Sequence, residues 1–103
     1  MAEKTYDNAS QERGYAVLLT LAGHEFAGLA PSEIAAAVNA SRSRITSDLR
    51  VLQKMGLAEP ILETGRWRLG PKLVQIAIAF SDQLNRARTK LDEITQRYTR
   101  MPS

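Results

Sequence analysis

The chain has 103 residues, a formal net charge of +3 and 44% hydrophobic residues, which suits one small folded domain better than a disordered chain. It contains no cysteine, so disulfide bonds and thiolate metal sites are excluded. The first residues lack the apolar core of a signal peptide, and the apolar stretch around residues 73–80 is too short to cross a bilayer. We therefore expect a cytoplasmic protein that does not associate with membranes.

The charge is unevenly distributed along the chain. Residues 1–40 hold two basic and five acidic side chains, a balance of −3. Residues 41–72 hold seven basic and three acidic side chains, a balance of +4, and the remaining segment is +2. Positive charge is thus concentrated in the middle of the chain, where a polyanion would have to make contact.

The first helix is predicted to begin after a flexible N-terminal segment, residues 1–9. Ser10 is a plausible N-cap, and apolar spacing extends the helix to about residue 22, where Gly23 ends it. In the connection that follows, Phe26 and Leu29 are expected to pack inward. The buried face of the helix is predicted to contain Ala16, Val17, Leu18 and Leu21.

The second helix is predicted to start at Pro31, because proline is favoured at the first helical position. Asn39 is a plausible left-handed C-cap, since asparagine tolerates a positive φ. Small side chains at residues 35–37 and at Ala40 let a third helix approach closely, as a helix-turn-helix requires.

The third helix carries the strongest signal in the sequence. Ser41 is its expected N-cap, and Gly56 lies where a C′ glycine belongs. A rotation of 100° per residue puts the apolar side chains on one face and short polar or basic side chains on the other. Such a helix suits a DNA major groove, where hydroxyls keep the backbone close to base edges and arginines reach guanine or phosphate. The candidates for base contact are Ser43, Arg44, Thr46 and Ser47, and those for phosphate contact are Ser41, Arg42, Arg50 and Lys54. The alternative is an ordinary solvated helix face.

Residues 57–62 and 66–69 are predicted to form a β-hairpin, with Glu63 to Gly65 as its turn. Trp67 is expected to point to the core, and Pro60 must lie at an edge or a bulge. Arg66 and Arg68 would point outward as further phosphate candidates, although exposed arginines on a strand also protect an edge against pairing. The predicted fold class is therefore mostly α with a small β-hairpin: a winged helix-turn-helix over residues 10–72, followed by a long C-terminal helix.

The last predicted helix runs from residue 71 to about residue 100, a length of about 45 Å. Apolar residues recur along it at alternating steps of four and three, as in a coiled coil, before a short tail at residues 101–103. A helix this long needs a partner, and a second copy is the simplest one. The predicted dimerisation residues in the segment 73–100 are Phe80, Leu84, Ala87, Leu91, Ile94 and Tyr98.

The residues that flank this apolar seam leave alternatives open. Arg88, Lys90 and Arg97 have no acidic complement, whereas a parallel pair usually sets opposite charges there. The first half of the helix could pack on the winged domain, and the rest could pair antiparallel or bind another regulatory protein.

Several segments between residues 13 and 77 together resemble the N-terminal winged-helix domain of IclR-type transcription regulators. The resemblance lies in Leu-Ala-Pro-Ser-Glu-Ile-Ala at 29–35, Ser-Arg-Ser-Arg-Ile at 41–45 and the wing exit Gly-Arg-Trp-Arg-Leu-Gly-Pro-Lys-Leu at 65–73. It also includes Leu-Leu-Thr-Leu-Ala at 18–22 and Leu-Arg-Val-Leu-Gln-Lys-Met-Gly-Leu at 49–57. The resemblance implies a DNA-binding regulator.

The sequence departs from this family in two places. Family members normally continue into a large ligand-sensing domain, whereas this sequence ends at Ser103, which fits either a truncated chain or a stand-alone regulator, for example one encoded by a phage. Asp48 stands where the family commonly has an apolar residue, so its local packing or a contact with the wing is expected to differ.

These observations predict a sequence-specific, repressor-like transcription regulator that binds double-stranded DNA as a homodimer on a pseudo-palindromic site. The alternative is a protein-interaction module that binds a partner through its long helix. His24 has no second histidine or cysteine beside it, and no catalytic base and acid pair accompanies the serines. We therefore expect no metal, no cofactor and no enzymatic activity.

Overall fold

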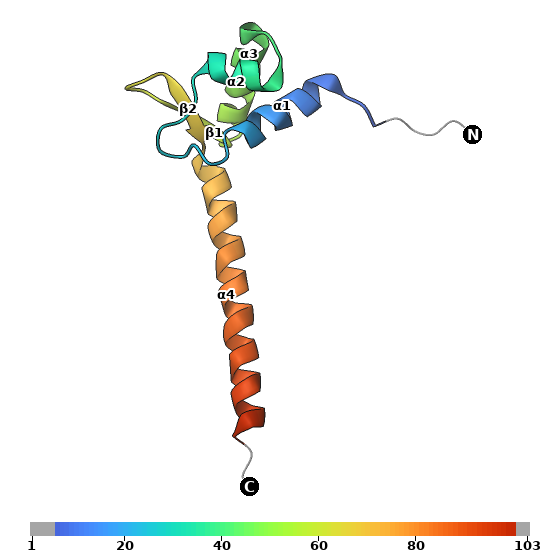
Figure 1. Cartoon of the computed structure of the whole chain (residues 1–103), viewed down its shortest axis with the longest axis vertical. Coiled ribbons are helices and arrows are strands. Elements are labelled where there is room, and N and C mark those ends of the chain that lie inside the picture. The colour runs from blue at the N-terminus through green and yellow to red at the C-terminus, as the bar shows by residue number, and fades with distance from the viewer. Residues whose placement is uncertain (1–5, 101–103) are drawn as a thin grey trace, which may run out of the picture. The chain divides into compact units, whose positions relative to one another are not determined.

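The computed structural model describes residues 6–100, and the elements appear in the predicted order (Figure 1). The described chain divides after Leu73 into two compact units. The outermost parts of the predicted N-terminal segment and tail, residues 1–5 and 101–103, lie outside the described residues. The elements are α1 (Ala9–Thr20), α2 (Pro31–Val38), α3 (Arg42–Lys54), β1 (Ala58–Ile61), β2 (Arg66–Leu69) and α4 (Pro71–Thr99).

The ends of the helices follow local signals in the sequence. Pro31 is the first residue of α2, Asn39 takes the predicted left-handed conformation with a φ of 55°, and Ser41 caps α3. The expected cap of α1 was wrong. The side chain of Asn8 accepts a hydrogen bond of 3.1 Å from the backbone N–H of Gln11, so Ser10 already lies inside the first turn. Asparagine and serine cap helices about equally well, so residue type alone does not decide between Asn8 and Ser10.

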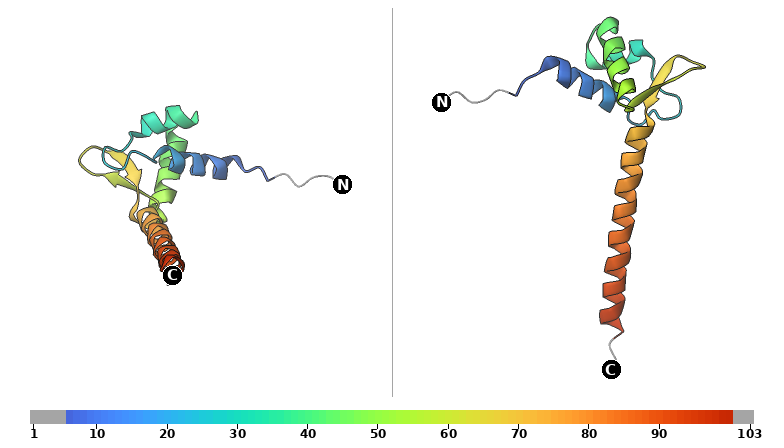
Figure 2. Two further views of the ribbon diagram at one scale, coloured as in Figure 1. Left: turned by 60° about the horizontal axis from the view of Figure 1, so that its bottom comes forward. Right: turned by 180° about the vertical axis from the view of Figure 1, so that it is seen from behind.

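The core of the first unit lies where α3 packs against α1, α2 and β1 (Figure 2). Phe26 and Leu29 were both expected to pack inward. Leu29 is buried, but the expectation for Phe26 was wrong, since its side chain is 95% exposed on the loop after α1. The largest fully buried side chains come from the three helices and from the residue that follows α1; they are Val17, Leu21, Ile34, Ile45 and Leu49.

The hairpin is held to the helices through a short backbone bridge. β1 and β2 are antiparallel, and Pro60 faces Trp67 across the pair. On its other side Trp67 exchanges two backbone hydrogen bonds of 2.8 Å with Leu29. Since both backbone groups of Trp67 point toward Leu29, the missing N–H of Pro60 costs the sheet no hydrogen bond, which explains a proline in this edge strand.

The loop residue Gly28 lies close against the backbone of Trp67, beside this bridge. Gly28→Ala is therefore expected to destabilise the fold. Its φ is +70°, and a Cβ atom there would lie 2.7 Å from the carbonyl oxygen of Trp67. We expect a loss of at least about 1 kcal/mol in the free energy of unfolding, measured by urea denaturation. Gly14→Ala on α1 is the control, because a Cβ atom there meets nothing within 4 Å and alanine favours a helix. A loss at Gly14 as large as that at Gly28 would contradict this account.

The second unit contains most of α4, a helix of 29 residues with no buried side chain. Its apolar seam is open to solvent in the single chain. Phe80 is 70% exposed, Leu91 is 63% exposed and Tyr98 is 73% exposed. Neither α4 nor any other helix within residues 6–100 combines the length and apolar character needed to span a membrane.

Candidate nucleic-acid interface

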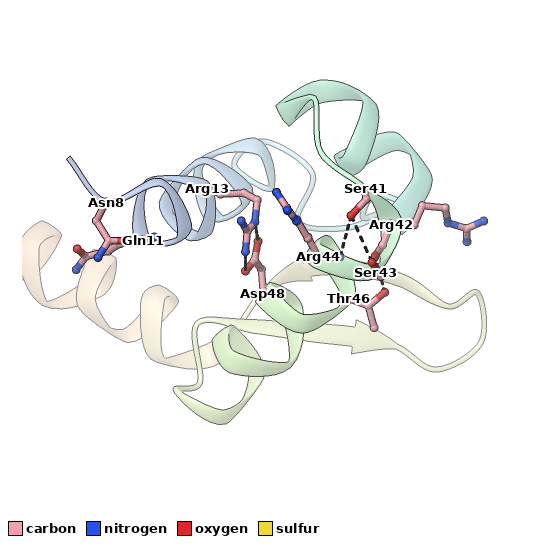
Figure 3. A network of polar contacts seen from close by, with 9 residues as sticks. All are labelled: Asn8, Gln11, Arg13, Ser41, Arg42, Ser43, Arg44, Thr46 and Asp48. Atoms are coloured by element: carbon pink, nitrogen blue, oxygen red, sulfur yellow. Dashed lines mark hydrogen bonds and ion pairs between the residues drawn. The ribbon is translucent and has the colours of Figure 1, made fainter.

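The candidate contact residues of α3 are all exposed, although Arg42 and Arg44 extend in different directions from the helix (Figure 3). Ile45, Leu49 and Leu52 hold the opposite face of the helix in the core. This burial fixes the direction in which the polar face points, because the two faces of a helix cannot be turned independently. The exposed set contains Arg42, Ser43, Arg44, Thr46, Ser47, Arg50 and Lys54, with Ser41 exposed at the start of the helix.

The hydroxyl groups near the start of α3 are partly committed to the helix itself (Figure 3). The Ser41 Oγ accepts a hydrogen bond of 3.3 Å from the Arg44 backbone N–H and lies 3.3 Å from the Ser43 Oγ. The Thr46 Oγ1 donates to the Arg42 carbonyl at 2.9 Å, so this hydroxyl has only acceptor capacity left. Within residues 6–100 the Ser47 hydroxyl has no such bond, which leaves it free to donate and accept.

The negative charge on α3 is neutralised by an arginine that the sequence analysis did not single out. The carboxylate of Asp48 accepts two hydrogen bonds from Arg13 on α1, from Nε at 2.7 Å and from Nη2 at 3.1 Å (Figure 3). The hydrogen bond to Asp48 raises the pKa of the Arg13 guanidinium. The departure from the family at Asp48 therefore has a structural partner, but on α1 and not on the wing.

This pairing leaves the basic side chains of α3 unopposed. Asp48 is the only acidic residue of the helix. Arg42, Arg44, Arg50 and Lys54 form no ion pair with any other residue in the described part of the chain. The amino-terminal end of a helix adds partial positive charge beside Arg42 and Arg44. The exposed face of α3 is therefore electropositive and carries hydrogen-bond donors and acceptors.

The turn between α2 and α3 leaves room next to this face. A shallow hollow of about 570 Å³ is lined by alanines of α2, by the turn and by Arg44. Ala35 and Ala36 have short side chains, so they fill little of this hollow. The amino-terminal half of α3 is thus accessible to a large ligand.

The two arginines of the wing are engaged within the fold. Arg66 donates from Nε to the Ala27 carbonyl and from Nη2 to the Gly28 carbonyl, both at 3.0 Å, and its Nη1 pairs with Glu33 at 3.0 Å. Arg68 pairs through Nε with Glu59 across the hairpin at 2.8 Å. Phosphate contact by these arginines stays a prediction, and their ion pairs would compete with it.

Glu33 connects the wing to the start of α2, and its charge is expected to make stability depend on pH. A hydrogen bond of 3.0 Å from the Ala30 N–H, assisted by Arg66, lowers the pKa of Glu33 below its ordinary value of 4.5. A lowered pKa means that the stabilisation is present above the ordinary value and is lost as the pH falls through the folded value. Glu33→Gln is therefore expected to lower the urea midpoint at pH 7, and this difference from the unchanged chain should shrink as the pH is taken well below 4.5. An equal difference at pH 7 and at low pH would show that the charge of Glu33 contributes nothing.

Comparison with known proteins relates the chain to others through its fold. No protein-family model matches the sequence. No curated protein matches it either. Among solved structures, the Cyprinid Herpesvirus3 ORF112-Zalpha domain bound to Z-DNA is 22% identical, with a TM-score of 0.53 over 60% of this chain and 98% of that one. An IclR family transcriptional regulator from Brucella abortus is 19% identical, with a TM-score of 0.62 over 78% of this chain.

A third similar structure is an S. aureus MepR variant bound to an oligodeoxyribonucleotide. It is 21% identical, with a TM-score of 0.51 over 80% of this chain. The chain spans 30% of the length of the Brucella protein and 62% of that of MepR. At these identities the likeness concerns the fold alone. Three helices, a two-stranded wing and a long C-terminal helix make this chain a winged helix-turn-helix protein.

Proposed function

We propose that this chain is a transcription regulator that recognises specific sequences in double-stranded DNA. The observation that carries the proposal is the exposed face of α3, where four basic side chains lack an acidic partner because Asp48 is neutralised by Arg13. A solvated helix face that binds no ligand gains nothing from four basic side chains without an acidic partner. A polyanion gains from it, because each basic side chain that meets a phosphate releases counterions.

In the proposed complex α3 lies in the major groove. Ser43, Arg44, Thr46 and Ser47 occupy the first two turns and face the bases, where an arginine can read guanine and a threonine methyl group can contact thymine. The residues assigned to phosphate contact are Ser41, Arg42, Arg50 and Lys54, with Arg66 and Arg68 of the wing as secondary candidates.

The proposed regulator acts as a homodimer through the C-terminal segment 73–100, on a pseudo-palindromic site. The support is the open seam on α4, because large apolar side chains exposed along a helix of this length need a cover. The segment 10–72 is then the DNA-binding domain. The proposed dimerisation residues are Phe80, Leu84, Ala87, Leu91, Ile94 and Tyr98.

The family is proposed to be that of IclR-type regulators acting as repressors. The wing exit at residues 65–73 and the structural likeness to the Brucella regulator support this assignment. The names of two other similar structures, one bound to Z-DNA and one to an oligodeoxyribonucleotide, also support DNA as the ligand. The exposed seam of α4 equally favours a second candidate function, a module that binds another protein through this helix.

A selection from random double-stranded DNA with the purified chain tests these functions. An enriched inverted repeat, bound with an affinity that falls steeply as salt is raised, is the expected result. Enrichment of a single half-site would retain specific recognition and reject the two-fold dimer. Recovery of no motif, with only weak binding that salt abolishes, would reject the proposed function in favour of the protein-interaction module.

A further inference from the structure

We propose that α4 pairs with α4 of a second copy in antiparallel orientation, in the register that sets Leu84 against the partner's Ala87. The inference rests on the proposed homodimer and adds its geometry. The eight residues of the seam are Leu73, Ala77, Phe80, Leu84, Ala87, Leu91, Ile94 and Tyr98, and in α4 they follow one another at steps of four and three.

The sizes of the seam residues favour this orientation. Pairing in parallel would set Ala77 against Ala77 and Ala87 against Ala87, so two layers would be underfilled while Phe80 met Phe80 between them. In the antiparallel register Ala77 meets the partner's Ile94, Ala87 meets the partner's Leu84, and Phe80 meets the partner's Leu91. Every alanine then faces a large aliphatic side chain, and no cavity is left in the seam.

The register follows from the same residues. In the proposed alignment all eight seam positions have a partner, and Leu73 faces the partner's Tyr98. Sliding one helix by a heptad in one direction leaves Leu73 and Ala77 of each chain unpaired. Sliding it in the other direction leaves Ile94 and Tyr98 unpaired. Ile94 and Tyr98 are large and exposed in the single chain, and Leu73 is large and half-buried, so both shifts would lose apolar burial.

The charges of α4 favour the same orientation. Residues 82–100 hold five basic and three acidic side chains, a balance of +2, whereas residues 71–81 hold one basic and no acidic side chain. A parallel pair would set the two charged halves side by side. In the antiparallel pair Arg88 lies near the partner's Ser81 and Lys90 near the partner's Gln83, so no like charges meet at the flanks of the seam. The two helix dipoles also oppose each other.

The two orientations differ in how far apart they set the points where the winged units are attached. In the antiparallel register the Leu73 residues of the two chains, where the winged units are attached, are separated by 25 residues along the helix axis, about 38 Å. A parallel pair would instead attach both winged units at one end of the two helices.

Disulfide trapping can test the orientation directly, because the chain has no cysteine of its own. The variants are Ala77→Cys and Ile94→Cys in the full chain, each oxidised alone and as an equimolar mixture prepared under reducing conditions. In the antiparallel register residue 77 faces residue 94, whereas two copies of residue 77 lie about 25 Å apart, too far for a disulfide bond. Covalent dimers on non-reducing electrophoresis are therefore expected from the mixture and not from either variant alone.

Covalent dimers from each variant alone, at least as abundant as from the mixture, would establish parallel pairing and overturn the proposal. Absence of covalent dimers from all three samples would also overturn it, and sedimentation of the reduced variants would then show whether the chain pairs through another surface or is monomeric. The DNA selection is independent of this result, so failure of the antiparallel register can be told apart from failure of the proposed function.

Discussion

Replacing Arg44 and Ser47 together by alanine is expected to lower the affinity for the selected DNA by at least about tenfold, and by up to several hundredfold. Both side chains are exposed on the amino-terminal half of α3, and within the described residues neither is engaged by another side chain. Losing a bidentate contact to a base costs about 1–3 kcal/mol, and the serine adds a smaller share. Fluorescence anisotropy on a labelled duplex would measure the change.

Arg86→Ala is the control for the lost charge. Arg86 is an exposed arginine on α4 and lies outside the seam, so this variant removes one positive charge from the chain without touching α3. We expect less than about a threefold change in affinity, since distant surface charges are screened by salt. Equal losses in the two variants, or an unchanged sequence preference in the double variant, would mean that α3 does not read the bases.

The parts of the fold that local chemistry decides could be predicted from the sequence. Pro31, Asn39, Ser41 and Gly56 mark helix ends because each satisfies a backbone requirement of its own position, and all four lie where expected. The apolar spacing of α3 likewise predicted which side chains of that helix are buried. Such signals act over three or four residues and need no knowledge of the rest of the chain.

Long-range contacts could not be predicted in the same way. Arg13 and Asp48 are 35 residues apart, and nothing at either position indicates that α1 and α3 bring them together. Phe26 is a large aromatic residue of the kind that usually lies in a core, yet its side chain is 95% exposed on the loop after α1. Burial of a loop side chain depends on tertiary packing, which overrides hydrophobicity alone.

The candidate site was therefore predictable only in part. Periodicity places the polar residues of α3 on one face, because a helix repeats every 3.6 residues. It does not show that Asp48 is neutralised, and without this fact the net charge of the face is underestimated. Alternation in the wing predicted outward arginines, but the acceptors that engage Arg66 come from the loop at 27–28 and from α2.

Introducing a carboxylate into the seam with Leu84→Asp is expected to convert the dimer into a monomer. Leu84 lies near the centre of the seam, and its side chain is 42% exposed in the single chain. A dimer would bury two carboxylates near its centre without a hydrogen-bond partner, which costs several kcal/mol. Sedimentation equilibrium measures the change in mass.

The same variant is expected to bind the inverted repeat at least about a hundredfold more weakly, because the second half-site is no longer held at a millimolar effective concentration. Its affinity for an isolated half-site should be unchanged, since α3 is intact. Thr89→Asp is the matched control, because residue 89 lies on α4 between seam positions, faces away from the seam, and receives the same charge. A dimer that survives Leu84→Asp, or that Thr89→Asp disrupts equally, would show that the seam of α4 is not the surface that joins the two copies.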